Sequence, residues 1–223
     1  MERGLKPPLQ AIVGLSRDGL GTVFRLGTRY PDILIVPWLF DAPMLVVYLM
    51  ARVGSLCIPF LLGLVDKRAV QQLSDFSKRE IQVAFQAAAA RTNLGYLMIC
   101  GALALLVFGS VPRIAAAIGV TDPTLPDVLF WLVLGQSAPV LFGATGLLMR
   151  VVERGAFYDV LLGVTAGLFV LGIAILDLRE ALFVAQAFAA AQLTLAAICA
   201  LLLTQCGIWP GLTALFHKEI KLF

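Results

Sequence analysis

The sequence is poor in charge. Only 14% of its 223 residues are charged, and it contains a single histidine, His217, in a polar C-terminal tail. A soluble domain has about a quarter of its residues charged. Here 60% of the residues are hydrophobic, and the mean hydropathy is +0.93. This composition excludes an ordinary soluble domain and indicates a polytopic membrane protein.

Groups that carry enzyme chemistry are also scarce. The sequence has no Asp-x-Asp motif, no His–Asp pair and no sizeable segment outside the apolar runs in which a base, nucleophile or metal would be positioned. The cysteines follow no zinc or redox spacing, so we interpret them as small buried hydrophobes. They are Cys57, Cys100, Cys199 and Cys206. We therefore predict that the chain is not an enzyme and holds neither a cofactor nor a metal.

Long apolar runs recur along the chain, and a run of about 20 residues crosses a hydrocarbon core about 30 Å thick. The runs are continuous rather than alternating, which favours helices over barrel strands. We predict an all-α transmembrane helix bundle of about six spans, forming one domain over residues 1–223. The expected spans are residues 9–40, 43–65, 94–111, 125–149, 157–176 and 181–205.

Residues 66–93 are polar with a helical period, and this pattern predicts a cytoplasmic helix lying at or rising from the membrane surface. The first ten residues lack a compact apolar core followed by a cleavage site, so we expect no removable signal peptide.

Basic residues in the short links predict the orientation. If both termini are cytoplasmic, the outside links carry only Arg113 and Arg179. The inside segments then carry Arg3, Lys6, Lys67, Arg68, Lys78, Arg79, Arg91, Arg150, Arg154, Lys218 and Lys221. We predict a multi-pass protein of the plasma membrane (the bacterial inner membrane) with both termini inside. The net charge of +3 then reflects orientation and gives no reason to expect a nucleic acid partner.

The first span contains an unusual set of charges. On a helical wheel all of them fall within about a third of the circumference. They are Arg17, Asp18, Arg25, Arg29 and Asp32. A charge at mid-bilayer costs at least about 2.5–3.5 kcal/mol, so this face should look into protein or a water-filled cavity. Pro31 and Pro37 should kink the span.

Arg52 lies at about the depth of Asp32 if the outer boundary is near Asp41, so we predict an ion pair between them. Arg25 and Arg29 would then remain unbalanced, and guanidinium groups suit phosphate oxygens. The candidate substrate-binding residues are Arg17, Arg25, Arg29, Arg52 and Asp32. Interfacial anchoring of Arg17, and structural pairing of Arg25 and Arg29 with nearby carboxylates or backbone carbonyls, are open alternatives.

The block "RYPDILIVPWLFDAPMLVVYLMARVGSLCIPFLLGLVDKRAVQQL" resembles one half of the flippases that move lipid-linked oligosaccharides. These belong to the polysaccharide-export branch of the multidrug/oligosaccharidyl-lipid/polysaccharide superfamily, which has a MATE-like fold. The similarity rests on the Asp early in "DILIVPWLF", the small-residue turn "DAP", and the Tyr-x-x-Ala-Arg pattern "YLMAR". It extends over residues 15–148 and covers the last two spans by topology alone.

The resemblance implies a polyprenyl-diphosphate-linked sugar as substrate, for cell-surface polysaccharide biosynthesis, and a central cationic cavity. Members usually have twelve to fourteen spans in two bundles, and this chain is more similar to the second, C-terminal, bundle. A second six-span half or a homodimer is therefore an expected partner, with membrane lipid around both. The turn "FDAP" departs from the family, which often has Gly-Pro and a following Gly there.

Other functions compete with this one. An ion-coupled drug or metabolite exporter of the same superfamily would need a buried acid, for which Asp18, Asp32 and Asp159 are candidates. A half-size remnant or scaffold subunit would not transport at all. Gly163 and Gly167, four residues apart, favour close helix packing within the chain or a dimer face.

Overall fold

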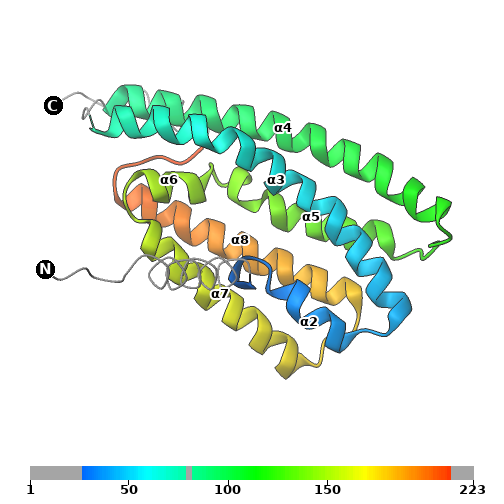
Figure 1. Cartoon of the computed structure of the whole chain (residues 1–223). Coiled ribbons are helices and arrows are strands. Elements are labelled where there is room, and N and C mark those ends of the chain that lie inside the picture. The colour runs from blue at the N-terminus through cyan, green and yellow to red at the C-terminus, as the bar shows by residue number, and fades with distance from the viewer. Residues whose placement is uncertain (1–26, 79–81, 212–223) are drawn as a thin grey trace, which may run out of the picture.

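The protein's structure is a computed structural model that describes residues 27–78 and 82–211. This part of the chain is helical and contains no strand. Its helices are α2 (Pro31–Leu39), α3 (Ala42–Lys78), α4 (Gln82–Ala117), α5 (Leu125–Leu141), α6 (Thr145–Val151), α7 (Gly155–Leu176) and α8 (Ala181–Gln205). They form an elongated bundle in which successive long helices run in opposite directions (Figure 1).

Five helical stretches are long and apolar enough to cross a membrane: Ala42–Asp66, Val83–Ala117, Leu125–Val151, Gly155–Leu176 and Ala181–Gln205. They confirm the predicted all-α bundle and match five of the expected spans. The expected first span, residues 9–40, lies mainly outside the described residues. Its described part includes α2, which at nine residues is shorter than a membrane crossing.

Residues 66–93 do not form a separate surface helix. Residues 66–78 belong to the end of α3 and residues 82–93 to the start of α4, and in each helix this part continues from the apolar stretch without a break. The extension of α3 beyond Asp66 adds about 18 Å at 1.5 Å per residue. It buries Ala69 and Leu73, and the facing start of α4 buries Phe85 and Ala89. This apolar stripe pairs the end of α3 with the start of α4.

The expected fourth span is broken into α5 and α6. Gly143, with φ of 101°, and Ala144, with φ of 54°, lie in the left-handed region between the two helices. A Cβ atom on Gly143 would lie 2.2 Å from the backbone nitrogen of Gly211. The last described stretch therefore crosses directly over the break, where only glycine fits.

The carboxamide of Gln86 holds this last stretch in place. Its Nε2 donates to the carbonyl of Gly207 at 3.0 Å, and its Oε1 accepts from the backbone N–H of Trp209 at 3.3 Å. The start of α4 is thus fastened to the chain that leaves α8, beside the break between α5 and α6.

Helix α5 lies at the centre of the bundle. In the span that contains α5, 61% of the most apolar stretch is buried inside the bundle, whereas the corresponding share for α7 is 17%. It packs most extensively on α8, where a Cβ on Gly135 would come within 3.0 Å of the Phe188 ring. The absence of a side chain at Gly135 lets the two helices approach closely, as small residues do between membrane helices.

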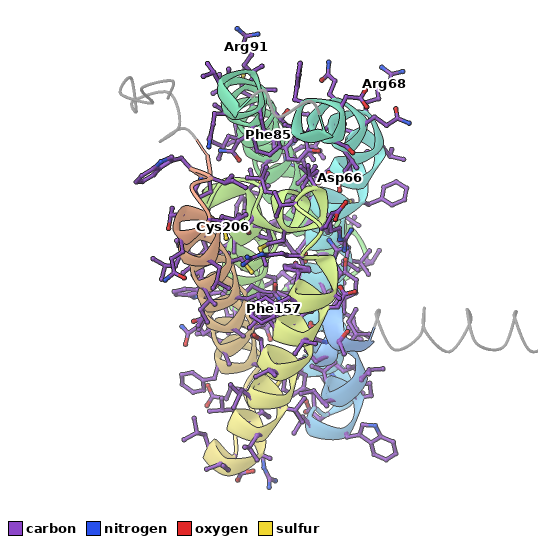
Figure 2. The ribbon with its side chains drawn as sticks, turned by 90° about the vertical axis from the view of Figure 1, so that its left-hand side faces the viewer. Asp66, Arg68, Phe85, Arg91, Phe157 and Cys206 are labelled. Carbon is purple, nitrogen blue, oxygen red and sulfur yellow. The ribbon has the colours of Figure 1, made fainter. Side chains whose placement is uncertain are left out.

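The two ends of the bundle differ in charge. One end, which we call the basic end, holds the end of α3, the start of α4, the α6–α7 link and the end of α8 (Figure 1). Figure 2 looks onto the basic end, where Arg68 and Arg91 extend outward. The opposite end carries Arg113 and Arg179, and Arg179 pairs with Asp177 at 2.8 Å on an exposed surface. Which end faces the cytoplasm stays a prediction from the basic residues of the links.

We predict that Gly143→Ala lowers the thermal unfolding midpoint of the purified protein. The added Cβ would meet the backbone at Gly211, and a left-handed conformation costs a non-glycine residue about 1–2 kcal/mol before any clash. Gly101→Ala is the matched control, because a Cβ there meets nothing within 4 Å. Equal midpoints for the two variants would contradict the packing described for the break.

Candidate functional site

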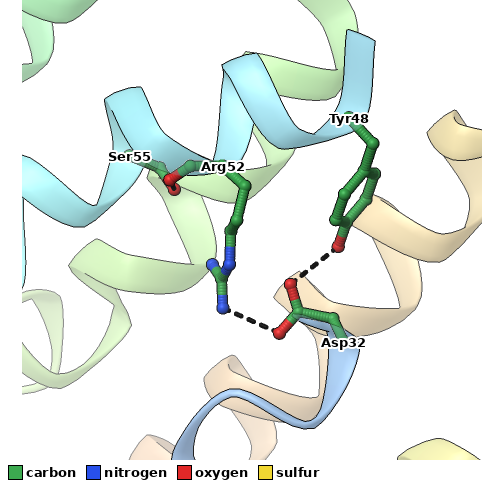
Figure 3. Close-up of polar contacts among 4 residues, drawn as sticks. All are labelled: Asp32, Tyr48, Arg52 and Ser55. Atoms are coloured by element: carbon green, nitrogen blue, oxygen red, sulfur yellow. Dashed lines mark hydrogen bonds and ion pairs between the residues drawn. The ribbon is translucent and has the colours of Figure 1, made fainter. Parts of the chain in front are cut away.

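A buried ion pair joins α2 to α3. Asp32 and Arg52 are 0% and 1% exposed, and Nη2 of Arg52 lies 2.8 Å from Oδ1 of Asp32. The hydroxyl of Tyr48, one turn before Arg52, donates to Oδ2 of Asp32 at 2.9 Å. Both carboxylate oxygens are therefore engaged, as Figure 3 shows. The predicted ion pair is confirmed.

Aromatic rings complete the surroundings of Arg52. Its guanidinium carbon lies 4.2 Å from the ring centroid of Phe188 on α8 and 5.2 Å from that of Tyr30. Nε and Nη1 of Arg52 find no hydrogen-bond partner among the described residues, and the ring faces supply the remaining attraction for the cation. The cluster of Asp32, Tyr48, Arg52 and Phe188 joins α2, α3 and α8. In this conformation the cluster therefore holds the three helices together.

A separate cavity of about 550 Å³ opens within the basic half of the bundle. Its size falls in the range of about 300–1,000 Å³ that is usual for small-molecule sites. The lining comes from the segment before α2 and from α3, α4, α5, α6 and α7. Its polar residues are Arg29, Asp66, Gln71, Tyr96, Gln136, Arg150 and Tyr158.

Two guanidinium groups give the cavity its positive charge. Arg29 precedes α2, and its guanidinium carbon lies 5.6 Å from the ring centroid of Tyr30. Arg150 lies on α6, with its guanidinium carbon 5.9 Å from the ring centroid of Tyr158. Both side chains are exposed. Within the described ranges 27–78 and 82–211, neither forms an ion pair.

A carboxylate and neutral polar groups face the same space. The hydroxyl of Tyr96 donates to Oδ1 of Asp66 at 2.5 Å, linking α4 to α3. Gln136, 9% exposed, adds a carboxamide from α5. No group of three or more potential metal ligands occurs in the described part of the chain. The arrangement suits a ligand that carries negative charge together with hydrogen-bonding groups.

The predicted site residues separate into three groups. Arg29 lines the cavity. Arg52 and Asp32 are sealed in the buried pair and do not line it, so in this conformation neither is open to a ligand. Arg17 and Arg25 lie outside the described residues. A direct contact of any of these five with substrate stays a prediction.

Sequence reasoning missed six polar lining residues: Asp66, Gln71, Tyr96, Gln136, Arg150 and Tyr158. Tyr96 and Gln136 are polar residues inside apolar runs, and that signal could have identified them. Arg150 was assigned to a link at the membrane surface. The break at Gly143 instead gives it a place on α6 beside the cavity.

Comparisons with known proteins give no assignment: no family model, no curated protein and no solved structure matches the chain. The case for a function therefore rests on the residues of the buried pair and the cavity.

We predict that Arg52→Leu strongly lowers the stability of the purified protein, because it leaves the Asp32 carboxylate buried without its counter-charge. Breaking one side of a buried ion pair typically costs about 3–5 kcal/mol. The double variant Asp32→Leu with Arg52→Leu should recover part of the loss in thermal unfolding, since no lone charge remains. A double variant no more stable than the single one would show that the charges are not energetically coupled.

Proposed function

We propose that this chain is a component of a membrane transporter that translocates a polyprenyl-diphosphate-linked oligosaccharide for cell-surface polysaccharide biosynthesis. The observation that carries the proposal is the cavity in which Arg29 and Arg150 have no ion-pair partner among the described residues. No bond is broken in such a reaction, and the protein's task is to bind the charged headgroup on one side and release it on the other.

Electrostatics favour a phosphorylated headgroup. Two guanidinium groups that share one cavity repel each other unless an anion lies between them, and each presents a planar fork that matches phosphate oxygens. The apolar part of the lining includes Leu62, Val140 and Leu162. The prenyl chain would remain in the bilayer, where the exposed apolar faces of α4 and α7 also lie.

The position of the cavity fits loading from the cytoplasm. Asp66, Arg150 and Tyr158 all lie near the basic end of the bundle. From the positive-inside rule we infer that this end faces the cytoplasm, and we propose that the protein lies in the inner membrane of a bacterium with both termini on that side. A cavity open there receives a headgroup that is assembled inside the cell.

Alternating access requires parts that change their relative positions. The break between α5 and α6 is one candidate, because it frees Arg150 from a continuous helix. Pro59 in α3 and Pro112 in α4 remove helix hydrogen bonds at two further places. By the family resemblance, a second six-span half or a second copy of the chain would form the other wall of the pathway.

The alternatives make different predictions. An ion-coupled exporter would use an acid such as Asp66 as an ion site, and its transport would require a sodium or proton gradient. A half-size scaffold would bind a partner without moving any lipid. Arg29 and Arg150 form no ion pair with any described residue, and an anionic lipid headgroup explains this more directly than either alternative does.

We predict that Arg150→Gln and Arg29→Gln each reduce translocation of a lipid-linked oligosaccharide by about tenfold or more. A hydrogen bond to a charged group contributes about 1.5–3 kcal/mol. The measurement is a translocation assay in proteoliposomes, with the chain reconstituted together with any second half it requires. Arg179→Gln, on the exposed opposite end, is the control and should transport normally. Undiminished transport by both cavity variants at normal expression would reject these roles.

A further inference from the structure

We infer that Asp66, held by Tyr96, makes the cavity selective for a headgroup that carries sugar hydroxyls beside its phosphates. The pair would distinguish the glycosylated lipid carrier from the bare carrier diphosphate. This inference deepens the proposed function and rests on it.

Asp66 is positioned as an acceptor that faces the cavity. It ends the apolar stretch of α3, it is partly buried, and it lines the cavity. The hydroxyl of Tyr96, itself 4% exposed, donates to Oδ1. Among the described residues no lysine or arginine forms an ion pair with Asp66. An ionised carboxylate has about four acceptor positions and no donor, so most of its acceptor capacity remains for a ligand.

Tyr96 fixes the direction of that acceptor. The hydrogen bond of 2.5 Å runs from α4 to α3, and α4 packs along α3. A side chain held from a neighbouring helix loses less conformational freedom when it binds a ligand than a free one does. Phenylalanine at this position would keep the ring and remove only the tether.

The charges in the cavity explain the selectivity. Arg29 and Arg150 attract phosphate, and Asp66 repels it. A cavity that served only to bind phosphate would gain nothing from the carboxylate. A headgroup with hydroxyls next to its phosphates offsets the repulsion by donating hydrogen bonds to Asp66, whereas a bare diphosphate cannot. The same carboxylate thus favours one ligand and disfavours its close analogue, which is how specificity between related ligands commonly arises.

The neutral polar groups extend the same surface. Gln71 on α3 and Gln136 on α5 line the cavity with Asp66, and each carboxamide can both donate to and accept from hydroxyls. Together they form a polar wall suited to a polyhydroxylated group. The guanidinium groups of Arg29 and Arg150 provide the anion-binding part.

The test compares a polyprenyl diphosphate with the same polyprenyl diphosphate carrying one hexose, in which the sugar linkage replaces an ionisable terminal phosphate oxygen. Binding of each is measured by titration into full-length protein in nanodiscs. We expect the wild type to bind the glycosylated lipid about tenfold more tightly than the bare one, which is a difference of about 1.4 kcal/mol in binding free energy. Asp66→Asn should reduce that preference to about twofold, by weakening binding of the glycosylated lipid and strengthening binding of the bare one.

Tyr96→Phe should prefer the glycosylated lipid by a factor between those of the wild type and Asp66→Asn. If Asp66→Asn does not fold, the preference of Tyr96→Phe tests the inference in its place. Asp75→Asn is the matched control, because Asp75 lies on the same helix with an exposed side chain outside the cavity, and it should keep the wild-type preference. An unchanged preference in Asp66→Asn would overturn the inference. The inference would also be overturned if Asp66→Asn changed only the dependence of transport on a proton gradient. That result is the one expected for an ion-coupling acid.

Failure of the proposed function gives a different pattern. If the wild type binds neither lipid, or if Arg150→Gln binds both as tightly as the wild type does, the cavity is not an anion site and the transporter proposal fails with the inference. If both lipids bind through Arg150 and the sugar makes no difference, only the role of Asp66 is overturned.

Discussion

A charge inside a hydrocarbon phase must be either paired or hydrated, and this constraint organises the bundle. The structure meets it in two ways. Asp32 and Arg52 neutralise each other in a sealed pocket that Tyr48 and Phe188 complete. Arg29 instead faces an open cavity. Asp32 and Arg52 are the only buried charged residues in the described part of the chain, and the unburied charge of Arg29 lies at the cavity.

Packing places that charge in the cavity. Glycine at position 143 allows α5 to end and α6 to begin beneath the stretch that follows α8, and Gln86 fastens this stretch to α4. The break directs Arg150 to the cavity. The backbone conformation at Gly143 is thus linked to the contact with Gly211 and to the charge in the cavity. A change at the break should alter the position of the Arg150 guanidinium group.

Much of this arrangement could be predicted from residue patterns. Apolar runs located five spans, and equal depth on neighbouring helices predicted the Asp32–Arg52 pair, because both signals depend only on hydrophobicity and helical rise. The break at Gly143 could not be predicted in this way, since it depends on a contact with Gly211, far away along the chain. The same applies to Asp66: its place in the cavity follows from the packing of α3 on α4, which a helical period alone does not specify.

The central claim is that the cavity between Arg29 and Arg150 receives the phosphates of a lipid headgroup. The most direct measurement is an experimental structure of the full chain in nanodiscs, with any required second half and a bound polyprenyl-diphosphate sugar. The account predicts that the diphosphate contacts both guanidinium groups and that the sugar lies toward Asp66. A headgroup bound elsewhere while the cavity stays filled with water, or a cavity closed by carboxylates paired with both arginines, would contradict it.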